Sequence, residues 1–120
     1  MSHQSLYIDF LIRAEAKSVH GLSEKTKAES QHLLDRIVIA DAHGKNLTVT
    51  QAMRLIDIAS PSTLHRRLGF LQSEALIAMV YHEGNRRTKF LVPLLKTQQY
   101  LAHMGRLMLA SVDAHPTTVQ

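Results

Sequence analysis

Apolar residues recur at helical spacing in two segments near the start of the chain. Over residues 6–19 they stand at i, i+3 and i+4, which is typical of an amphipathic helix, and they cover more than one face. Gly21 is expected to end this helix, and Ser23 is a suitable N-cap for a second one. The second helix is expected to run to His43, with Gly44 directly after it, and to bury its C-terminal half.

The middle of the chain predicts two short helices joined by a tight turn. Residues 47–49 are β-prone, and Thr50 is a suitable cap for a short helix over residues 51–58. Ser60-Pro61 is a serine N-cap followed by proline at the first helical position, and the helix that it opens has leucines at i, i+4 and i+7. This order predicts a helix-turn-helix.

A β-hairpin and a last helix are expected next. Residues 75–81 form an extended apolar run, residues 82–85 contain glycine and asparagine, and residues 86–92 form a basic β-capable run. Pro93 is expected to open the last helix. The prediction is one mostly α domain over residues 1–120, a winged helix-turn-helix of order α-α-β-α-α-β-β-α. Its parts are N-terminal helices (6–43), a winged core (47–92), a C-terminal helix (93–110) and a tail (111–120).

Composition narrows the class of protein. Glycine (5) and proline (3) are scarce in the 120 residues, which favours helices, and the absence of cysteine excludes disulfides and thiolate metal sites. Apolar residues make up 45% and charged residues 20%, which argues against a disordered chain. No apolar stretch approaches the roughly 18 residues of a membrane span. The first residues show no secretory signal, so a cytoplasmic location is expected.

The positive charge is concentrated in one part of the sequence. Residues 60–92 contain five Lys and Arg side chains and two Glu side chains, which places a net +3 of the formal +4 there. A basic segment over a helix-turn-helix and a hairpin indicates a surface for a polyanion, most simply nucleic acid.

Three motifs resemble a known family. Ser60-Pro61-Ser62-Thr63-Leu64-His65-Arg66 fits a Ser-x-Ser-Thr-x-x-Arg recognition helix, and Ala75-Leu76-Ile77 stands where Gly-Leu-Val usually leads into a wing. Asn85-Arg86-Arg87 precedes a basic strand in the place of a wing's Asp-x-Arg, with asparagine replacing aspartate. With these motifs, residues 47–94 resemble the winged-helix core of the MarR (multiple-antibiotic-resistance regulator) transcription factors. The resemblance implies a dimeric regulator that binds specific double-stranded DNA.

The candidate DNA contacts lie on the second helix of the motif and on the hairpin. The helix is expected to enter the major groove, and the hairpin is expected to lie along the backbone or enter the minor groove. Short hydroxyl side chains at a helix N-terminus suit phosphate, and arginine can form two hydrogen bonds with guanine in the major groove. Alternation along a strand places Arg87 and Lys89 on one face and Arg86 on the other. The alternative is that these charges form a solvated helix face and a protected edge strand. The predicted contacts are Ser60, Ser62, Thr63, His65, Arg66, Arg67, Asn85, Arg86, Arg87 and Lys89.

The terminal helices are expected to form a homodimer. Both carry more apolar surface than one core face requires, and family members dimerise through such helices. The stripe on the last helix could instead line a ligand cavity. The predicted interface residues are Leu6, Tyr7, Phe10, Leu11, Leu101, Met104 and Met108.

Two other functions remain open. One is a winged-helix module that pairs with another regulator through protein contacts. The other is a switch controlled by a small molecule or metal, although no effector is indicated, no cofactor is expected, and the repeated tripeptide Asp41-Ala42-His43 and Asp113-Ala114-His115 lacks further ligands. An enzyme is not expected, because the sequence has no phosphate loop or nucleophile motif.

Overall fold

The computed structural model describes residues 2–17 and 27–114. The chain forms two compact units, one of residues 1–21 with 98–120 and one of residues 22–97. The proposed helix boundaries Gly21 and Ser23 lie outside the described residues, as does the predicted tail from residue 115. The single-domain organisation stays a prediction.

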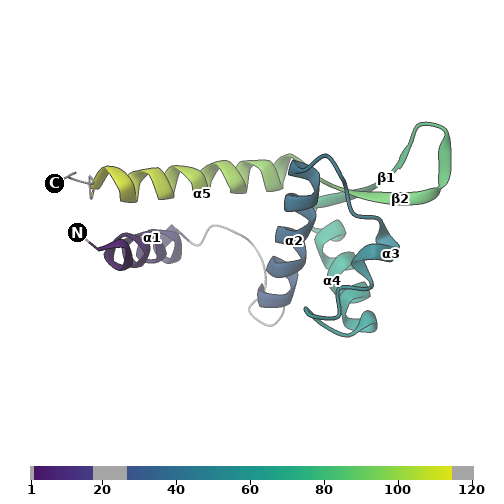
Figure 1. The fold of residues 1–120 in the computed structure, drawn as a ribbon, viewed down its shortest axis with the longest axis horizontal. Helices are drawn as coiled ribbons and strands as arrows, with labels where there is room; N and C mark the ends of the chain where they lie inside the picture. Colours follow the sequence, from purple (N-terminus) through teal and green to yellow (C-terminus); the bar gives the residue numbers. More distant parts are fainter. Residues whose placement is uncertain (1, 18–26, 115–120) are drawn as a thin grey trace. The chain divides into compact units, whose positions relative to one another are not determined.

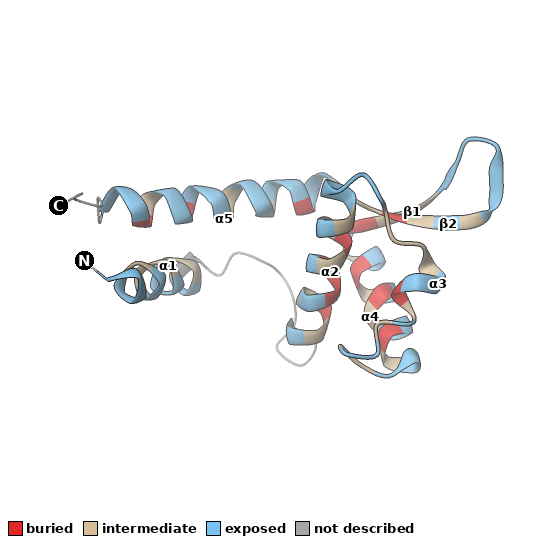
Figure 2. Ribbon diagram, viewed as in Figure 1, coloured by how far each residue is buried: buried red, intermediate tan, exposed pale blue. Residues whose placement is uncertain are grey.

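In the described part of the unit of residues 22–97, three helices and a hairpin surround one core. Figure 1 shows their arrangement. In chain order its elements are α2 (Lys27–Ala42), α3 (Val49–Ala52), α4 (Pro61–Ser73), β1 (Ile77–His82) and β2 (Asn85–Pro93). Figure 2 shows buried residues along α2 and α4 and at the base of the hairpin. The core consists of Leu33, Leu34, Ile37, Ala52, Leu68, Leu71, Leu76, Ile77 and Leu91. The leucines of α4 that the sequence pattern placed on one face, Leu64, Leu68 and Leu71, are all buried.

The end of α2 confirms the role predicted for Gly44. Its backbone N–H donates to the carbonyl of Asp41, and that of Lys45 donates to Ala40, which is the hydrogen-bond pattern of a Schellman cap. Gly44 has a φ of +72°, a left-handed conformation that glycine adopts without a Cβ clash.

The short helix differs from the prediction. α3 covers only Val49–Ala52, and its N-cap is Thr48 rather than Thr50. The Thr48 hydroxyl accepts from the Gln51 N–H while the Gln51 side chain accepts from the Thr48 N–H. This capping box starts the helix two residues earlier than expected, and turns replace helix after Ala52.

The start of α4 agrees with the prediction. Ser60 is the N-cap, its hydroxyl accepts from the Thr63 N–H, and Pro61 begins the helix. The helix ends in a second Schellman-type cap, where the N–H groups of Ala75 and Leu76 donate to Gln72 and Leu71. Ala75 has a φ of +58°, so an alanine occupies a left-handed position here.

The hairpin is antiparallel, with Tyr81 opposite Lys89 and Ile77 opposite Pro93. Pro93 therefore ends β2. The prediction that Pro93 opens the last helix is wrong. The β-prone residues 47–49 contribute one bridge, Thr48 to Phe90, and the Leu47 carbonyl accepts from the Leu91 N–H. The first expected strand is thus reduced to a single point of pairing, because the capping box turns the chain into α3 at Thr48.

The terminal helices are α1 (His3–Lys17) and α5 (Leu95–Ala114). α1 begins earlier than predicted, and α5 begins and ends later. The Thr97 hydroxyl at the start of α5 donates to the Leu76 carbonyl at 2.6 Å. This bond holds the first turn of α5 against the residue that precedes β1. Among the described helices, none combines the length and the apolar character needed to cross a membrane.

Candidate nucleic-acid interface

The outer face of α4 presents polar side chains at its N-terminal end. Ser62, His65 and Arg66 are exposed, whereas the leucines of the opposite face are buried. The Thr63 hydroxyl accepts from Ser60 and from the Arg66 guanidinium, both at 3.1 Å. The predicted residues at this helix end are therefore close together, and the first backbone N–H groups of the helix lie beside them.

Arg67 lies apart from this group. Its guanidinium forms an ion pair of 2.9 Å with Glu29 of α2, and its side chain is only 18% exposed. The structure thus places Arg67 between α4 and α2, where it joins the two helices, although its neighbour Arg66 is on the open face.

Asn85 shapes the hairpin turn. Its side-chain oxygen accepts from the backbone N–H groups of Arg87 at 3.0 Å and Thr88 at 3.3 Å, and Gly84 before it has a φ of +79°. The Asn85 side chain is therefore engaged with the backbone of its own turn.

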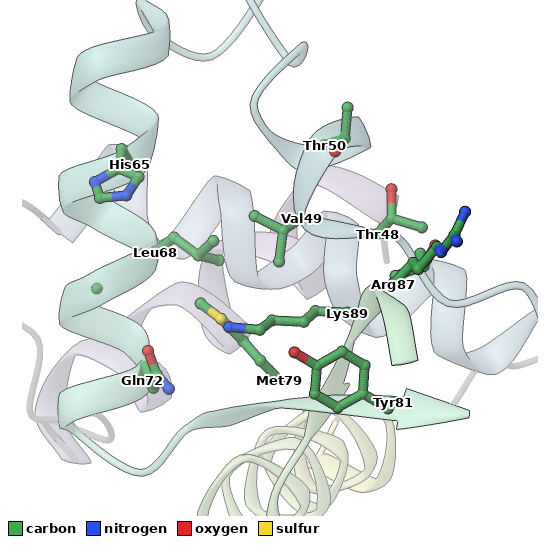
Figure 3. A pocket seen from close by; sticks show the side chains of 12 residues that line it. Thr48, Val49, Thr50, His65, Leu68, Gln72, Met79, Tyr81, Arg87 and Lys89 are labelled. Atoms are coloured by element: carbon green, nitrogen blue, oxygen red, sulfur yellow. The ribbon is translucent and has the colours of Figure 1, made fainter. Parts of the chain in front are cut away.

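A groove of about 400 Å³ lies between α4, the start of α3 and the hairpin. Arg87 and Lys89 line it from the hairpin, and His65 lines it from α4, whereas Arg86 is absent from its walls. Figure 3 shows the Lys89 side chain extending from the hairpin toward α4. The structure therefore brings three predicted residues to one groove and confirms that Arg87 and Lys89 share a face.

The groove also contains residues that the sequence analysis did not select. Its polar lining includes Thr48, Thr50, Gln72 and Tyr81. Tyr81 is 50% exposed, although it ends the apolar run that predicted the strand. The period-2 alternation that placed Lys89 with Arg87 would have located Tyr81 there too, once its opposite position to Lys89 was known.

The cations of the hairpin have no acidic partner among the residues that the structure describes. Within the described residues, no hydrogen bond or ion pair engages the side chains of Arg86, Arg87 or Lys89. By contrast, Arg36 and Arg67 in the same unit pair with Asp57 and Glu29. No carboxylate is among the described residues that line the groove. The hairpin and the outer face of α4 therefore offer positive charge that no described side chain neutralises.

The terminal helices expose large apolar side chains. Leu6, Tyr7 and Phe10 of α1 and Met108 and Val112 of α5 line one cavity of about 210 Å³. Of the predicted interface residues, Tyr7, Leu11, Leu101 and Met108 are exposed, and Leu6, Phe10 and Met104 are half-buried. Further exposed apolar side chains on these helices are Ile8, Ile12, Leu109 and Val112.

In the part of the chain that the structure covers, no group of three His, Asp or Glu side chains is placed to hold a metal ion. Asp41 accepts a hydrogen bond from Asn46 at 2.8 Å. His115 of the second repeated tripeptide lies outside the described residues.

Comparison with known proteins identifies the fold. No family model matches the sequence, and no curated protein matches it significantly. The structure of the heme sensor protein PefR from Streptococcus agalactiae in complex with heme is similar, with a TM-score of 0.55 and 19% identity over 93% of this chain and 71% of that one. Heme-free PefR gives a TM-score of 0.54 and 18% identity over 91% and 72% of the two chains.

At these identities the likeness concerns the fold, which agrees with the element order predicted from the sequence. The expected fold is therefore confirmed: this chain has a winged helix-turn-helix core, preceded by α1 and followed by α5 in the sequence.

Proposed function

We propose that this protein is a transcriptional regulator, rather than an enzyme, and that it binds double-stranded DNA as a homodimer. The observation that carries the proposal is the distribution of paired and unpaired cations. Arg86, Arg87 and Lys89 have no acidic partner among the described residues, whereas Arg36 and Arg67 do. A surface of uncompensated cations attracts a polyanion, and DNA is the polyanion that a winged helix-turn-helix fits.

In this proposal α4 lies in the major groove of the duplex. The groove is about 12 Å wide and accepts one helix, whose N-terminal residues face the base edges. Arg66 and His65 are exposed near that end and are suited to contact bases. Ser60, Ser62 and Thr63 are assigned to phosphate, because hydroxyl groups and free backbone N–H groups at a helix start favour anions.

The homodimer is supported by the apolar side chains of the terminal helices. Tyr7 and Ile12 of α1 are 61% and 62% exposed, and Met108 and Leu109 of α5 are 56% and 60% exposed. Large apolar patches on soluble proteins mark interaction sites, and a second copy would cover the same faces by two-fold symmetry. The cavity between α1 and α5 opens among these residues, so the partner would also close it.

PefR is described as a heme sensor, which is a property of that protein. The cavity between α1 and α5 measures about 210 Å³. Pockets for cofactors usually measure roughly 300–1,000 Å³. The size of this cavity therefore favours its closure by protein side chains.

Titration of a fluorescent random-sequence duplex tests the proposal. Binding is expected to weaken steeply as salt rises, with each neutralised phosphate contributing about −0.9 to the slope of log K against log salt. Once an operator sequence has been identified, the protein should bind it more tightly than it binds the random-sequence duplex. If no duplex binds at low salt, the proposal fails, and the exposed apolar and basic surfaces would instead fit a module that pairs with another protein.

A further inference from the structure

We infer that Tyr81, on the hairpin wall of the groove between α4 and the hairpin, contacts the sugar-phosphate backbone of the DNA strand that lies between these two elements. The inference rests on the proposed function. It adds a contact residue, Tyr81, that lies on β1 and outside the basic run of residues 86–92.

Duplex geometry supports this position. In the proposed complex α4 lies in the major groove and the hairpin reaches the adjacent minor groove. A single backbone then separates the two elements, since one DNA strand forms the wall between the two grooves. The concave surface between α4 and the hairpin must then face that strand. In this protein that surface is the groove of about 400 Å³ lined by His65, Arg87 and Lys89.

The chemistry of the groove fits a phosphodiester. Its described walls contain cations but no carboxylate, so an anion meets attraction without opposing charge. Hydroxyl donors stand on both sides, with Thr48 and Thr50 at the start of α3 and Tyr81 on β1. Cationic groups interspersed with neutral donors are the combination that binds phosphate oxygens in protein–DNA complexes.

Tyr81 is the most informative of these donors. It lies directly opposite Lys89 in the hairpin, so its side chain and the Lys89 ammonium reach into the groove from adjacent strands. Figure 3 shows both side chains on the hairpin side of the groove, facing α4. The Tyr81 side chain is half exposed, and no described group bonds it. A tyrosine hydroxyl held beside a lysine is well placed to donate to the same or a neighbouring phosphate.

The alternation of β2 provides a contrast within the same strand. Arg86 and Arg87 are adjacent and carry the same charge, but only Arg87 lines the groove. If a DNA strand occupies the groove, Arg87→Ala should weaken DNA binding more than Arg86→Ala. A wing that contacts DNA only through the positive charge of its tip would make the two substitutions equivalent.

Salt-dependent binding to a random-sequence duplex tests the inference with a lysine-matched control. Lys89→Ala is expected to make the slope of log K against log salt less steep by about 0.9, because one phosphate contact is lost. Lys45 is exposed but does not line the groove, so Lys45→Ala should leave the slope unchanged. Equal slopes for Lys89→Ala and the unmodified chain, or an equal decrease in both lysine variants, would overturn the inference.

Tyr81→Phe isolates the hydroxyl group. The ring remains, so thermal unfolding should not change, whereas affinity for all duplexes should fall by about tenfold with the salt slope unaltered. If Tyr81→Phe and Lys89→Ala both bind like the unmodified chain while Arg66→Ala still binds more weakly, the groove inference is wrong and the proposed function stands. If the unmodified chain binds no duplex, both fail.

Discussion

Ala75 illustrates how one residue departs from what its backbone position favours. It occupies the left-handed position that closes α4, with a φ of +58°. Glycine is usual there because it lacks the Cβ that crowds the carbonyl, and the resemblance motif has glycine at this place. The match to the Gly-Leu-Val motif thus pointed to this position, and the structure shows the left-handed backbone conformation that makes glycine favourable there.

Ala75→Gly is therefore expected to stabilise the protein by about 0.5–1 kcal/mol, the left-handed penalty less the added chain entropy of glycine. Chemical denaturation measures this as an increase in the midpoint. Gly44→Ala is the converse test, since Gly44 has a φ of +72° and open space around its missing Cβ. It should destabilise by about 1 kcal/mol. An unchanged midpoint for both would contradict the assignment.

Adjacent arginines on α4 are expected to differ in function. Arg66 is exposed at the open face, whereas Arg67 is paired with Glu29. Arg66→Ala should remove discrimination at one base pair, worth about 1–3 kcal/mol, with little effect on unfolding. Arg67→Ala should instead lower the stability by up to about 1 kcal/mol, discounted because Glu29 is partly exposed, and leave base preference intact. Binding assays with single-base operator variants, together with denaturation, check both; the reverse pattern would show that the two roles are exchanged.

At the scale of elements, the sequence predicted an element boundary correctly where one local motif acted alone, and wrongly where two residues could serve the same role. Ser60-Pro61 correctly located the start of α4, because the cap and the proline act within one turn. The start of α3 was misplaced, because Thr48 and Thr50 are both capping residues and only the reciprocal bond with Gln51 distinguishes them. Pro93 could begin a helix or end a strand, and its pairing with Ile77 shows that it ends β2.

Ser60 combines a cap with a proposed phosphate contact, and two substitutions separate these roles. Ser60→Ala removes the cap and should destabilise the protein by about 1 kcal/mol. Ser60→Asp retains a cap and suits the helix dipole, so stability should be kept. The added carboxylate should nevertheless repel phosphate and weaken binding to every duplex. Denaturation and duplex titration measure the two effects, and undiminished binding by Ser60→Asp would exclude this helix end from the interface.

At the scale of the whole molecule, the apolar pattern predicted the two terminal helices and their excess apolar surface. It could not locate the groove, because the groove forms only when α3, α4 and the hairpin meet. Tyr81 was missed for the same reason: its place beside Lys89 depends on the register of the hairpin. The cations were predictable as a basic segment, whereas the pairing of Arg67 depended on the position of α2.

The dimer is tested by a charge placed on an exposed apolar face. The unmodified chain should sediment as a dimer at micromolar concentration. Leu11 is 46% exposed on α1, so Leu11→Glu should give a folded monomer. Ile56 is 73% exposed in the turn before α4, so Ile56→Glu is the matched control and should remain dimeric. A monomeric unmodified chain would contradict the proposed homodimer.

Selection of bound sequences from a random duplex library tests the central claim most directly. A dimer with α4 in two successive major grooves should select a two-fold symmetric motif whose half-sites are about 10–10.5 base pairs apart. Arg66→Ala should make one position in each half-site indifferent to base identity. Selected sequences without any shared motif, and an Arg66→Ala variant with unchanged affinity and preference, would contradict a sequence-specific DNA-binding regulator.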